Sequence, residues 1–218
     1  MTEKTPDLSS VRASYDTVAV DYARLLGTEL FGKPLDRAML AAFAEYVRGD
    51  QAGGGRAVAD LGCGPGRVTA HLDSLGVRAF GVDLSPAMVA VARRTYPGLR
   101  FEVGSMAALD VADGVLGGVL AWYSTVHTPP GELPAVFAEF ARVLAPGGCV
   151  LIAFKAGDRR VRLEHAYGHP VDLDVYWTPP DLIAGLLGGA GLAEVGRLVR
   201  APDAHEKGPQ GFLLARKG

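Results

Sequence analysis

The segment VADLGCGPGR, residues 58–67, constrains the possible folds more than any other part of this sequence. A short apolar run leads into it, and glycines at positions 62, 64 and 66 then precede a helical pattern. Because glycine has no Cβ atom, such a backbone can turn sharply and lie directly against a ligand. A strand, a glycine-rich turn and a helix in this order are typical of the first unit of a doubly wound α/β sheet.

The rest of the chain continues to alternate short apolar runs with helical stretches, which predicts a mostly parallel sheet covered on both faces. The expected strands span residues 57–61, 79–82, 99–103, 118–123, 149–154, 194–200 and 211–216. The expected helices span 10–26, 34–48, a stretch ending near 75, a stretch capped by Ser85, 133–144, and a stretch that opens at Thr178 and Pro179. Residues 155–177 show no regular pattern. A short loop separates the last two strands, so we expect them to be antiparallel.

An acidic residue inside the first strand distinguishes this glycine loop from a dinucleotide site. Asp60 lies at the end of that strand, where a dinucleotide requires no acid. A buried carboxylate needs a partner, and the ammonium group of an amino-acid ligand would supply one, directly or through water. Pro65 lacks the backbone N–H that a pyrophosphate site uses. Both features favour a ligand without a pyrophosphate.

A second acid, Asp83, ends the second strand. A carboxylate at this point can accept charge-assisted hydrogen bonds from both hydroxyls of a ribose. Its alternative role is to cap the following helix, but Ser85 is the better cap. We therefore interpret Asp83 as a ribose ligand.

Four segments in this order resemble the motifs of class I S-adenosylmethionine-dependent methyltransferases. They are DLGCGPG (60–66), GVDLSPAM (81–88), GSMAAL (104–109) and RVLAPGG (142–148). The resemblance covers about residues 57–154, and the strand pattern extends it to the C-terminus. It implies an α/β, doubly wound seven-stranded Rossmann-like sheet with helices on both faces. The implied strand order is 3-2-1-4-5-7-6, with strand 7 antiparallel. We expect residues 1–52 to form an N-terminal helical cap and residues 53–218 to form the methyltransferase domain.

The resemblance also implies how the cofactor would lie. Asp60, Gly62 and Gly64, with Cys63 between them, would hold the methionine part, and Asp83 the ribose. Two further pairs would surround the adenine: Leu84 with Met88 on its faces, and Ser105 with Met106 at its edge. Relatives often have an acid near position 105, so this last contact departs from the family pattern.

The segment after the fourth strand, AWYSTVHTPP (121–130), is expected to form the floor of the reaction site, because ligands bind at the carboxyl ends of such strands. Trp122 and Tyr123 would offer carbonyls and aromatic faces to the cationic sulfonium. His127 is either a general base or a hydrogen-bonded residue that positions the cofactor. Tyr15 and Tyr22 lie two helical turns apart and face the same way, so they either pack in the core or close over the cofactor.

Residues 155–178 form an insert that we interpret as a lid over the acceptor. It contains several aromatic and acidic residues and two of the five histidines. His165, His169 and Tyr176 are the expected acceptor contacts. A metal site from His165, His169 and Asp172 is the alternative, but no helical or hairpin spacing brings these side chains together, and we expect no metal.

The charge balance bears on the possible partners. Lysines and arginines number 22 against 24 acids, giving a net charge of −2, and no basic stripe suits nucleic acid or an acidic membrane. No apolar run is long enough for a membrane span, and residues 1–10 carry no apolar leader. Cys63 and Cys149 lie far apart and form no metal or disulfide motif. We expect a cytoplasmic monomer or homodimer acting on a small-molecule acceptor.

The sequence therefore predicts methyl transfer from S-adenosylmethionine to a small molecule, with S-adenosylhomocysteine as the product and secondary metabolism as one setting. One alternative is another reaction that uses the same cofactor, such as a cyclisation or decarboxylation. A nicotinamide-dependent oxidoreductase and a non-catalytic binding module are further alternatives. Asp60 and Pro65 argue against the oxidoreductase.

Overall fold

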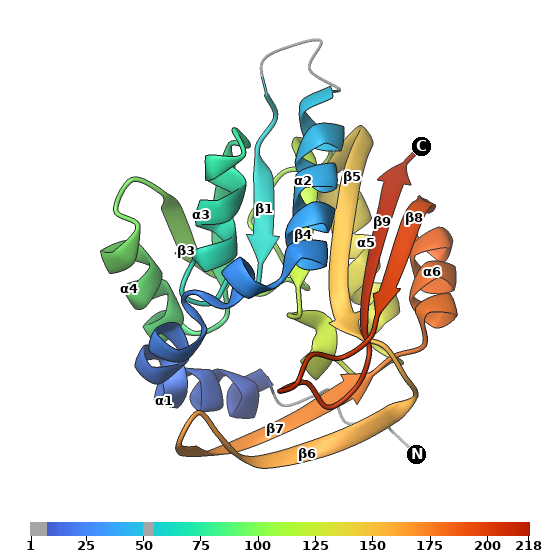
Figure 1. The fold of residues 1–218 in the computed structure, drawn as a ribbon. Coiled ribbons are helices and arrows are strands. Elements are labelled where there is room, and N and C mark those ends of the chain that lie inside the picture. Colours follow the sequence, from blue (N-terminus) through green and yellow to red (C-terminus); the bar gives the residue numbers. More distant parts are fainter. Residues whose placement is uncertain (1–7, 50–54) are drawn as a thin grey trace.

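The structure, a computed structural model, describes residues 8–49 and 55–218 and is built around one seven-stranded sheet (Figure 1). Its strands are β1 (Val58–Leu61), β2 (Ala79–Asp83), β3 (Arg100–Val103), β4 (Leu116–Trp122), β5 (Leu144–Lys155), β8 (Leu192–Arg200) and β9 (Gln210–Lys217). The spatial order is β3-β2-β1-β4-β5-β9-β8. Since β8 and β9 are the sixth and seventh strands of this sheet, the expected order 3-2-1-4-5-7-6 is confirmed.

The strand directions also agree with the expectation. β1, β2, β3, β4 and β5 pair in parallel, whereas β9 runs antiparallel to both of its neighbours. The carboxyl ends of the five parallel strands therefore meet at one edge of the sheet, the lower edge in Figure 1. In parallel sheets this is the edge where ligands bind.

Helices cover both faces of the sheet. They are α1 (Leu8–Leu26), α2 (Pro34–Gly49), α3 (Arg67–Ser74), α4 (Pro86–Thr95), α5 (Leu133–Val143) and α6 (Pro180–Gly189), with short 3₁₀ turns η1 (Glu29–Gly32) and η2 (Thr125–His127). On one face, α2 and α3 bury apolar side chains such as Phe43 and Leu72 against Leu120. On the other face, α5 and α6 bury Phe137 and Ile183. Side chains alternate across each strand, so both layers draw on the same strands.

The helix ends follow local chemistry. Ser85 caps α4 by accepting a hydrogen bond from the Met88 N–H at 3.1 Å, and Pro86 occupies the first turn, as predicted. Gly76 has a left-handed φ of 78° directly after α3. The helix expected to open at Thr178 and Pro179 is present as α6, with Pro179 at its N-cap position and Pro180 as its first residue. No side chain caps it, and Thr178 pairs with Ala156 in an isolated bridge.

The expectation of irregular structure over residues 155–177 is wrong. This segment forms an antiparallel hairpin of β6 (Arg159–Ala166) and β7 (His169–Trp177). Its turn places Tyr167 and Gly168 at positive φ, the geometry of tight hairpin turns. Leu173, Val175 and Trp177 alternate along β7 and are buried, while most of β6 is exposed.

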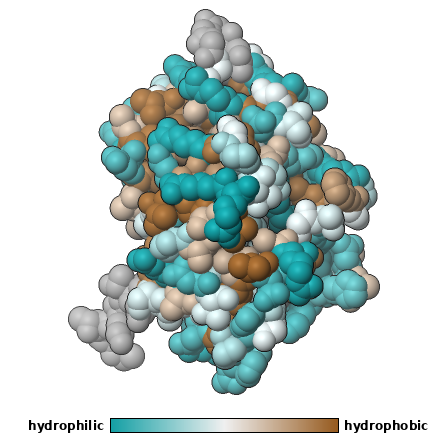
Figure 2. Space-filling model, turned by 90° about the vertical axis from the view of Figure 1, so that its left-hand side faces the viewer, coloured by the Kyte–Doolittle hydropathy of each residue, from teal (hydrophilic) through white to brown (hydrophobic). Residues whose placement is uncertain are grey.

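Helix α1 and the hairpin lie together across the carboxyl edge of the sheet (Figure 1). α2 packs on the sheet itself. The boundary expected at residue 53, with its Gly53–Gly54 joint, lies outside the described residues. No helix among the described residues is long and apolar enough to cross a membrane. On the face that carries α4, hydrophilic and hydrophobic residues are interspersed (Figure 2).

Candidate functional site

The glycine loop connects β1 to α3 at the carboxyl edge of the sheet and brings the backbone close to its neighbours. Gly62 has a left-handed φ of 74°, and a Cβ atom there would lie 2.3 Å from the Cβ of Ser124. Gly66 has a φ of 84° and would place a Cβ atom 2.7 Å from the Phe101 ring. Only glycine fits both the conformation and the space at these two positions.

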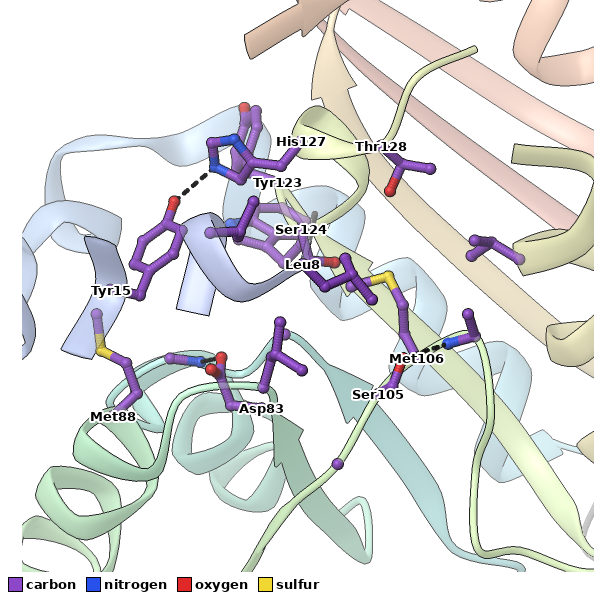
Figure 3. Close-up of a pocket in the computed structure, with 18 of the residues that line it drawn as sticks. Leu8, Tyr15, Asp83, Met88, Ser105, Met106, Tyr123, Ser124, His127 and Thr128 are labelled. Carbon is purple, nitrogen blue, oxygen red and sulfur yellow. Dashed lines mark hydrogen bonds between the residues drawn. The ribbon is translucent and has the colours of Figure 1, made fainter. Parts of the chain in front are cut away.

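The loop borders the main cavity of the site, shown in Figure 3. Twelve of the residues singled out in the sequence line it: Tyr15, Tyr22, Gly62, Gly64, Asp83, Leu84, Met88, Ser105, Met106, Trp122, Tyr123 and His127. Eight more residues complete the lining: Leu8, Val11, Gly104, Ala107, Ser124, Thr128, Glu132 and Val136. The fold thus gathers segments from α1, the ends of β1, β2 and β4, and the segment after β3 around one space.

Asp83 is held firmly at one end of this cavity. Its two carboxylate oxygens accept hydrogen bonds from the Gly64 and Ser85 backbone N–H groups, each at 2.8 Å. Burial raises the pKa of Asp83, and the two backbone hydrogen bonds oppose that increase. Each carboxylate oxygen has more than one acceptor position, so a fixed Asp83 can still accept hydroxyl donors from a ligand.

The neighbouring walls differ in their chemistry. Met88 is buried at the start of α4 and packs against Val18 on α1, and Leu84 lies beside it at the end of β2. Across the cavity, Ser105 accepts a hydrogen bond from the Ala107 N–H at 3.2 Å and Met106 lies next to it. These two segments face each other across the space in Figure 3.

A smaller cavity also adjoins the glycine loop and shares several lining residues with the main cavity. Its lining comprises Tyr22, Asp60, Gly62, Cys63, Gly64, Pro65, Arg67, Val68 and Trp122. Asp60 is fully buried and accepts a hydrogen bond from the Thr69 hydroxyl at 2.6 Å. Its Oδ1 atom has no hydrogen-bond partner among the described residues, and neither does Nη1 of Arg67. The Arg67 guanidinium also forms an ion pair with Glu29 at 2.8 Å through Nη2, so it is the Nη1 donor alone that, like Oδ1 of Asp60, is buried without a partner at this small cavity.

The titration of Asp60 reflects this missing partner. Burial raises the pKa of its carboxyl to about 7, and the Thr69 hydrogen bond offsets only part of that effect. A cation placed beside Oδ1 would lower the pKa again. Cys63, in the same loop, is buried against Gly81 and its thiol pKa is raised by that burial, so the thiol is an unreactive packing group.

His127 forms the centre of a hydrogen-bonded group at the opposite end of the main cavity. Its Nε2 atom lies 2.7 Å from the Tyr15 hydroxyl (Figure 3). Its Nδ1 atom lies 2.7 Å from the main-chain oxygen of Asp174 on β7. Burial lowers the pKa of His127, as does the charge of Lys155, while Asp174 opposes them. The imidazole is therefore neutral near pH 7. Burial also raises the pKa of Tyr15, which stays protonated.

The two aromatic residues at the carboxyl end of β4, Trp122 as its last residue and Tyr123 directly after it, serve partly as packing groups. Trp122 is buried, and its ring centroid lies 5.4 Å from that of Phe212. Tyr123 adopts a left-handed φ of 55°, which is strained for a non-glycine residue. Its ring contacts Trp122 and Phe212, and its buried hydroxyl has no partner in the described part of the chain. Tyr22 contacts Tyr15 and Tyr167 edge to face, so α1 and the hairpin turn meet through aromatic rings.

Three expected acceptor contacts lie elsewhere. His165 is exposed on β6, and His169 forms a hydrogen bond at 2.8 Å with Asp21 on the outer side of α1. Tyr176 stacks with the guanidinium of Arg160. None of the three lines either cavity. No group of three or more metal-ligating side chains converges within the described residues.

Sequence reasoning missed Arg67 and most of the outer lining. Arg67 directly follows the third glycine, so its position at the loop could have been predicted from the motif. Thr128 lies within the segment assigned to the floor of the site but was not singled out there, whereas Glu132 and Val136 lie beyond that segment, Glu132 at the N-cap of α5 and Val136 within α5. Leu8 and Val11 required knowing that α1 crosses the carboxyl edge, which no local pattern reveals.

Comparisons with known proteins agree with this fold. Residues 58–148 match the family described as "Methyltransferase domain". The chain is 32% identical over 152 residues to a demethylmenaquinone methyltransferase of Chlorobaculum parvum, an alignment that covers 68% of this chain and 61% of that protein. It is 36% identical over 100 residues to a trans-aconitate 2-methyltransferase of Methylobacterium nodulans, which covers 44% and 36% of the two chains. The chain thus spans less than two thirds of the length of these relatives.

Among solved structures, the magnesium protoporphyrin IX methyltransferase of Synechocystis with bound S-adenosylmethionine has a TM-score of 0.74 to this chain. The identity is 17% and both chains are covered completely, so the likeness concerns the fold. The sheet order, the glycine loop and the sequence matches together define a class I Rossmann-like methyltransferase domain. The chain belongs to the class I S-adenosylmethionine-dependent methyltransferases.

Proposed function

We propose that this protein transfers the methyl group of S-adenosylmethionine to a small-molecule acceptor and releases S-adenosylhomocysteine. The observation that carries the proposal is the pair of buried, unpaired atoms at the glycine loop, Oδ1 of Asp60 and Nη1 of Arg67. An amino-acid end has one ammonium and one carboxylate. A carboxylate and a guanidinium at the same small cavity are complementary to these two groups.

The rest of the cofactor fits the residues of the main cavity. Asp83 presents carboxylate oxygens for a ribose, as the sequence motif suggests. Leu84 and Met88 supply an apolar wall, and Ser105 and Met106 lie opposite, so an adenine between them would be enclosed. When bound, the cofactor would supply an activated methyl group on a cationic sulfur. The protein then has to align the acceptor and exclude water, which for well-oriented reactions corresponds to effective molarities of about 10⁵–10⁸ M.

The geometry argues against a nicotinamide cofactor. A dinucleotide has no amino-acid group to pair with Asp60, which would stay buried and uncompensated. Pro65 removes a backbone donor from the loop that would have to hold a pyrophosphate. The relatives named above methylate small molecules, by their names, which supports a small acceptor here as well. We further propose that the acceptor enters beside His127 and Tyr15, at the end of the cavity away from Asp83.

A labelling experiment tests this function. The protein is incubated with S-adenosylmethionine carrying a deuterated methyl group and a defined mixture of phenols, amines and carboxylic acids. Mass spectrometry should detect S-adenosylhomocysteine together with one product that retains the label. An Asp83→Ala variant should form neither compound at a comparable rate, which excludes a contaminating enzyme.

The same experiment separates the alternative reactions. Conversion of an acceptor without transfer of the label, while S-adenosylmethionine remains intact, would contradict methyl transfer and favour a reaction in which the cofactor only binds. Secondary metabolism remains one setting for such an enzyme, and the identity of the labelled product would assign it.

A further inference from the structure

The hydrogen-bond directions around His127 determine what this end of the cavity offers to a ligand. The Asp174 carbonyl can only accept, so Nδ1 carries the ring proton and Nε2 is an acceptor. Tyr15 therefore donates its hydroxyl proton to Nε2. Because its only proton is used in this hydrogen bond, the Tyr15 oxygen can act toward the cavity only as a hydrogen-bond acceptor. A ligand at this position must bring its own donor.

The surrounding wall sets the charge of that ligand. Four side chains give it an apolar surface: Leu8, Val11, Met106 and Val136. Its charged members within the described ranges, Asp83 and Glu132, are both acidic, and no lysine or arginine of those ranges lines the cavity. Asp83 lies at the other end of the cavity and Lys155 acts on His127 from outside the lining, so among the described lining residues a carboxylate on the acceptor would meet the acidic Glu132 and no cationic side chain.

We propose that the acceptor is a neutral, largely apolar molecule with a phenol-type hydroxyl, which donates a hydrogen bond to Tyr15 and passes its proton through Tyr15 to His127. This inference rests on the proposed function, because it places the acceptor beside the cofactor. A hydroxyl suits the site better than an ammonium group. An ammonium nitrogen has no lone pair until it loses a proton, whereas a hydroxyl oxygen can donate to Tyr15 and still attack with a lone pair.

The atoms balance in one step. The acceptor oxygen forms a bond to the methyl carbon as the carbon–sulfur bond breaks, and that electron pair stays on sulfur. The acceptor proton moves to Tyr15 Oη while the Tyr15 proton moves to His127 Nε2, so the products are an ether, a thioether and an imidazolium. Because burial weakens His127 as a base, the proton must come from a comparatively acidic hydroxyl. A phenol, with a pKa of about 10 like that of tyrosine, meets this requirement better than an alkyl alcohol.

The hairpin acts here as a positioning element. Asp174 belongs to β7, 47 positions along the chain from His127, and its main-chain oxygen fixes which ring nitrogen carries the proton. The Ser14 hydroxyl accepts a hydrogen bond from the Asp172 N–H at 2.9 Å and so joins α1 to the same strand. The hairpin, η2 and α1 therefore have to be assembled before Tyr15 and His127 can form their pair.

Binding of matched naphthalene probes tests the acceptor class without any need for turnover. The full-length protein is first saturated with S-adenosylhomocysteine and then titrated by calorimetry with 2-naphthol, 6-hydroxy-2-naphthoic acid or 2-naphthylmethylamine. We expect 2-naphthol to bind at least tenfold more tightly than the other two. Equal or tighter binding of the acid or the amine, or failure of 2-naphthol to bind the loaded protein, would overturn the inference.

Two variants test the proton path. Tyr15→Phe should weaken 2-naphthol binding about 3- to 10-fold, the loss of one neutral hydrogen bond, and should leave S-adenosylhomocysteine affinity within twofold. Tyr46→Phe, on the exposed side of α2, is the matched control and should change neither. His127→Gln should lower methylation of 2-naphthol about 10²–10⁴-fold, with His205→Gln on an exposed loop as its control.

Two further measurements distinguish proton transfer to His127 from a purely structural role of this residue. Nitrogen-15 NMR of labelled histidine should show the Nδ1–H form of His127 in the wild type, and its Nε2 resonance should shift in Tyr15→Phe. The methylation rate should fall at acidic pH, because a protonated His127 cannot accept the proton from Tyr15. The groups that face His127 are Tyr15, Asp174 and Lys155. An Nε2–H form, or turnover unchanged in His127→Gln, would overturn the proton path. Failure of S-adenosylhomocysteine itself to bind would instead refute the proposed function.

Discussion

At the scale of single residues, Asp60 and Arg67 place two buried charged groups at the small cavity. Both are taken out of water without a full set of partners, a costly arrangement that a zwitterionic ligand would relieve. Burial raises the folded-state pKa of Asp60 from 3.8 to about 7. Between these values the folded protein holds a proton that the unfolded chain has lost. The contribution of this group to stability therefore decreases as the pH rises from about 4 to 7.

We predict that affinity for S-adenosylhomocysteine increases between pH 6 and pH 8. The ligand ammonium binds the ionised form of Asp60, so binding should release part of a proton at neutral pH. Calorimetry in two buffers of different ionisation enthalpy measures that release directly. In Asp60→Asn the affinity should be lower and its rise across this range should disappear. An unchanged pH profile in this variant would show that another group titrates.

Asp83 provides a second test at this scale. We predict that Asp83→Ala weakens binding of S-adenosylmethionine by about 2–4 kcal/mol, because hydrogen bonds to a charged group contribute about 1.5–3 kcal/mol each. Asp73→Ala, on the exposed end of α3, is the control and should leave the affinity unchanged. A loss below about 0.5 kcal/mol by calorimetry would rule out Asp83 as the ribose ligand.

Local chemistry explains which site residues the sequence could predict. Asp60, Asp83 and the loop glycines follow strand ends, and a strand end fixes their position at the carboxyl edge whatever the rest of the chain does. The partner of His127 could not be predicted in this way. Asp174 acts through its main-chain oxygen, which carries no sequence signal, and it reaches the site through a hairpin far along the chain.

At the scale of elements, the hairpin β6–β7 was the part of the fold that the sequence did not reveal. Val161 and Leu163, and then Leu173, Val175 and Trp177, do alternate with polar residues, as strands require. The turn between them has Tyr167 and Gly168 at positive φ, where asparagine or aspartate with glycine is the usual signal. Because tyrosine is not one of the usual residues at the first of these positions, the sequence did not predict the turn. The strands of the main sheet were predictable because helices and glycine turns separate them.

The start of α3 offers a stability test of the glycine loop. We predict that Gly66→Ala destabilises the protein by at least about 2 kcal/mol, since it combines a strained backbone with overpacking. The new Cβ atom would meet the Phe101 ring at 2.7 Å. Gly98→Ala is the matched control, because a Cβ atom there meets nothing within 4 Å. Urea unfolding compares the two, and equal midpoints would mean that the loop relaxes around the methyl group.

At the scale of the whole molecule, a buried ionic cluster joins the N-terminal helices to the last strands. The Arg200 guanidinium on β8 contacts Asp36 on α2 at 2.7 Å and Glu206 in the β8–β9 loop at 2.6 Å. Lys33 forms ion pairs with Glu206 and Glu29. The cluster thus ties α2 and η1 to the far edge of the sheet.

We predict that Arg200→Met lowers the free energy of unfolding by about 3–5 kcal/mol, because it leaves Asp36 buried without its partner. Arg197→Met is the control, since its pairs with Glu194 and Asp181 are largely exposed and such pairs contribute about 0–1 kcal/mol. Chemical denaturation measures both variants. Losses of similar size would show that burial of the cluster adds nothing.

The central claim, that the cavity at the carboxyl edge binds S-adenosylmethionine, is tested most directly by calorimetric titration of the full-length protein. S-adenosylmethionine, S-adenosylhomocysteine and NADH are titrated separately under the same conditions. The fold, Asp60 with Arg67, and Asp83 predict micromolar binding of the two adenosyl ligands and none of NADH. Binding of NADH with no response to the adenosyl ligands would contradict the account and assign the glycine loop to a dinucleotide.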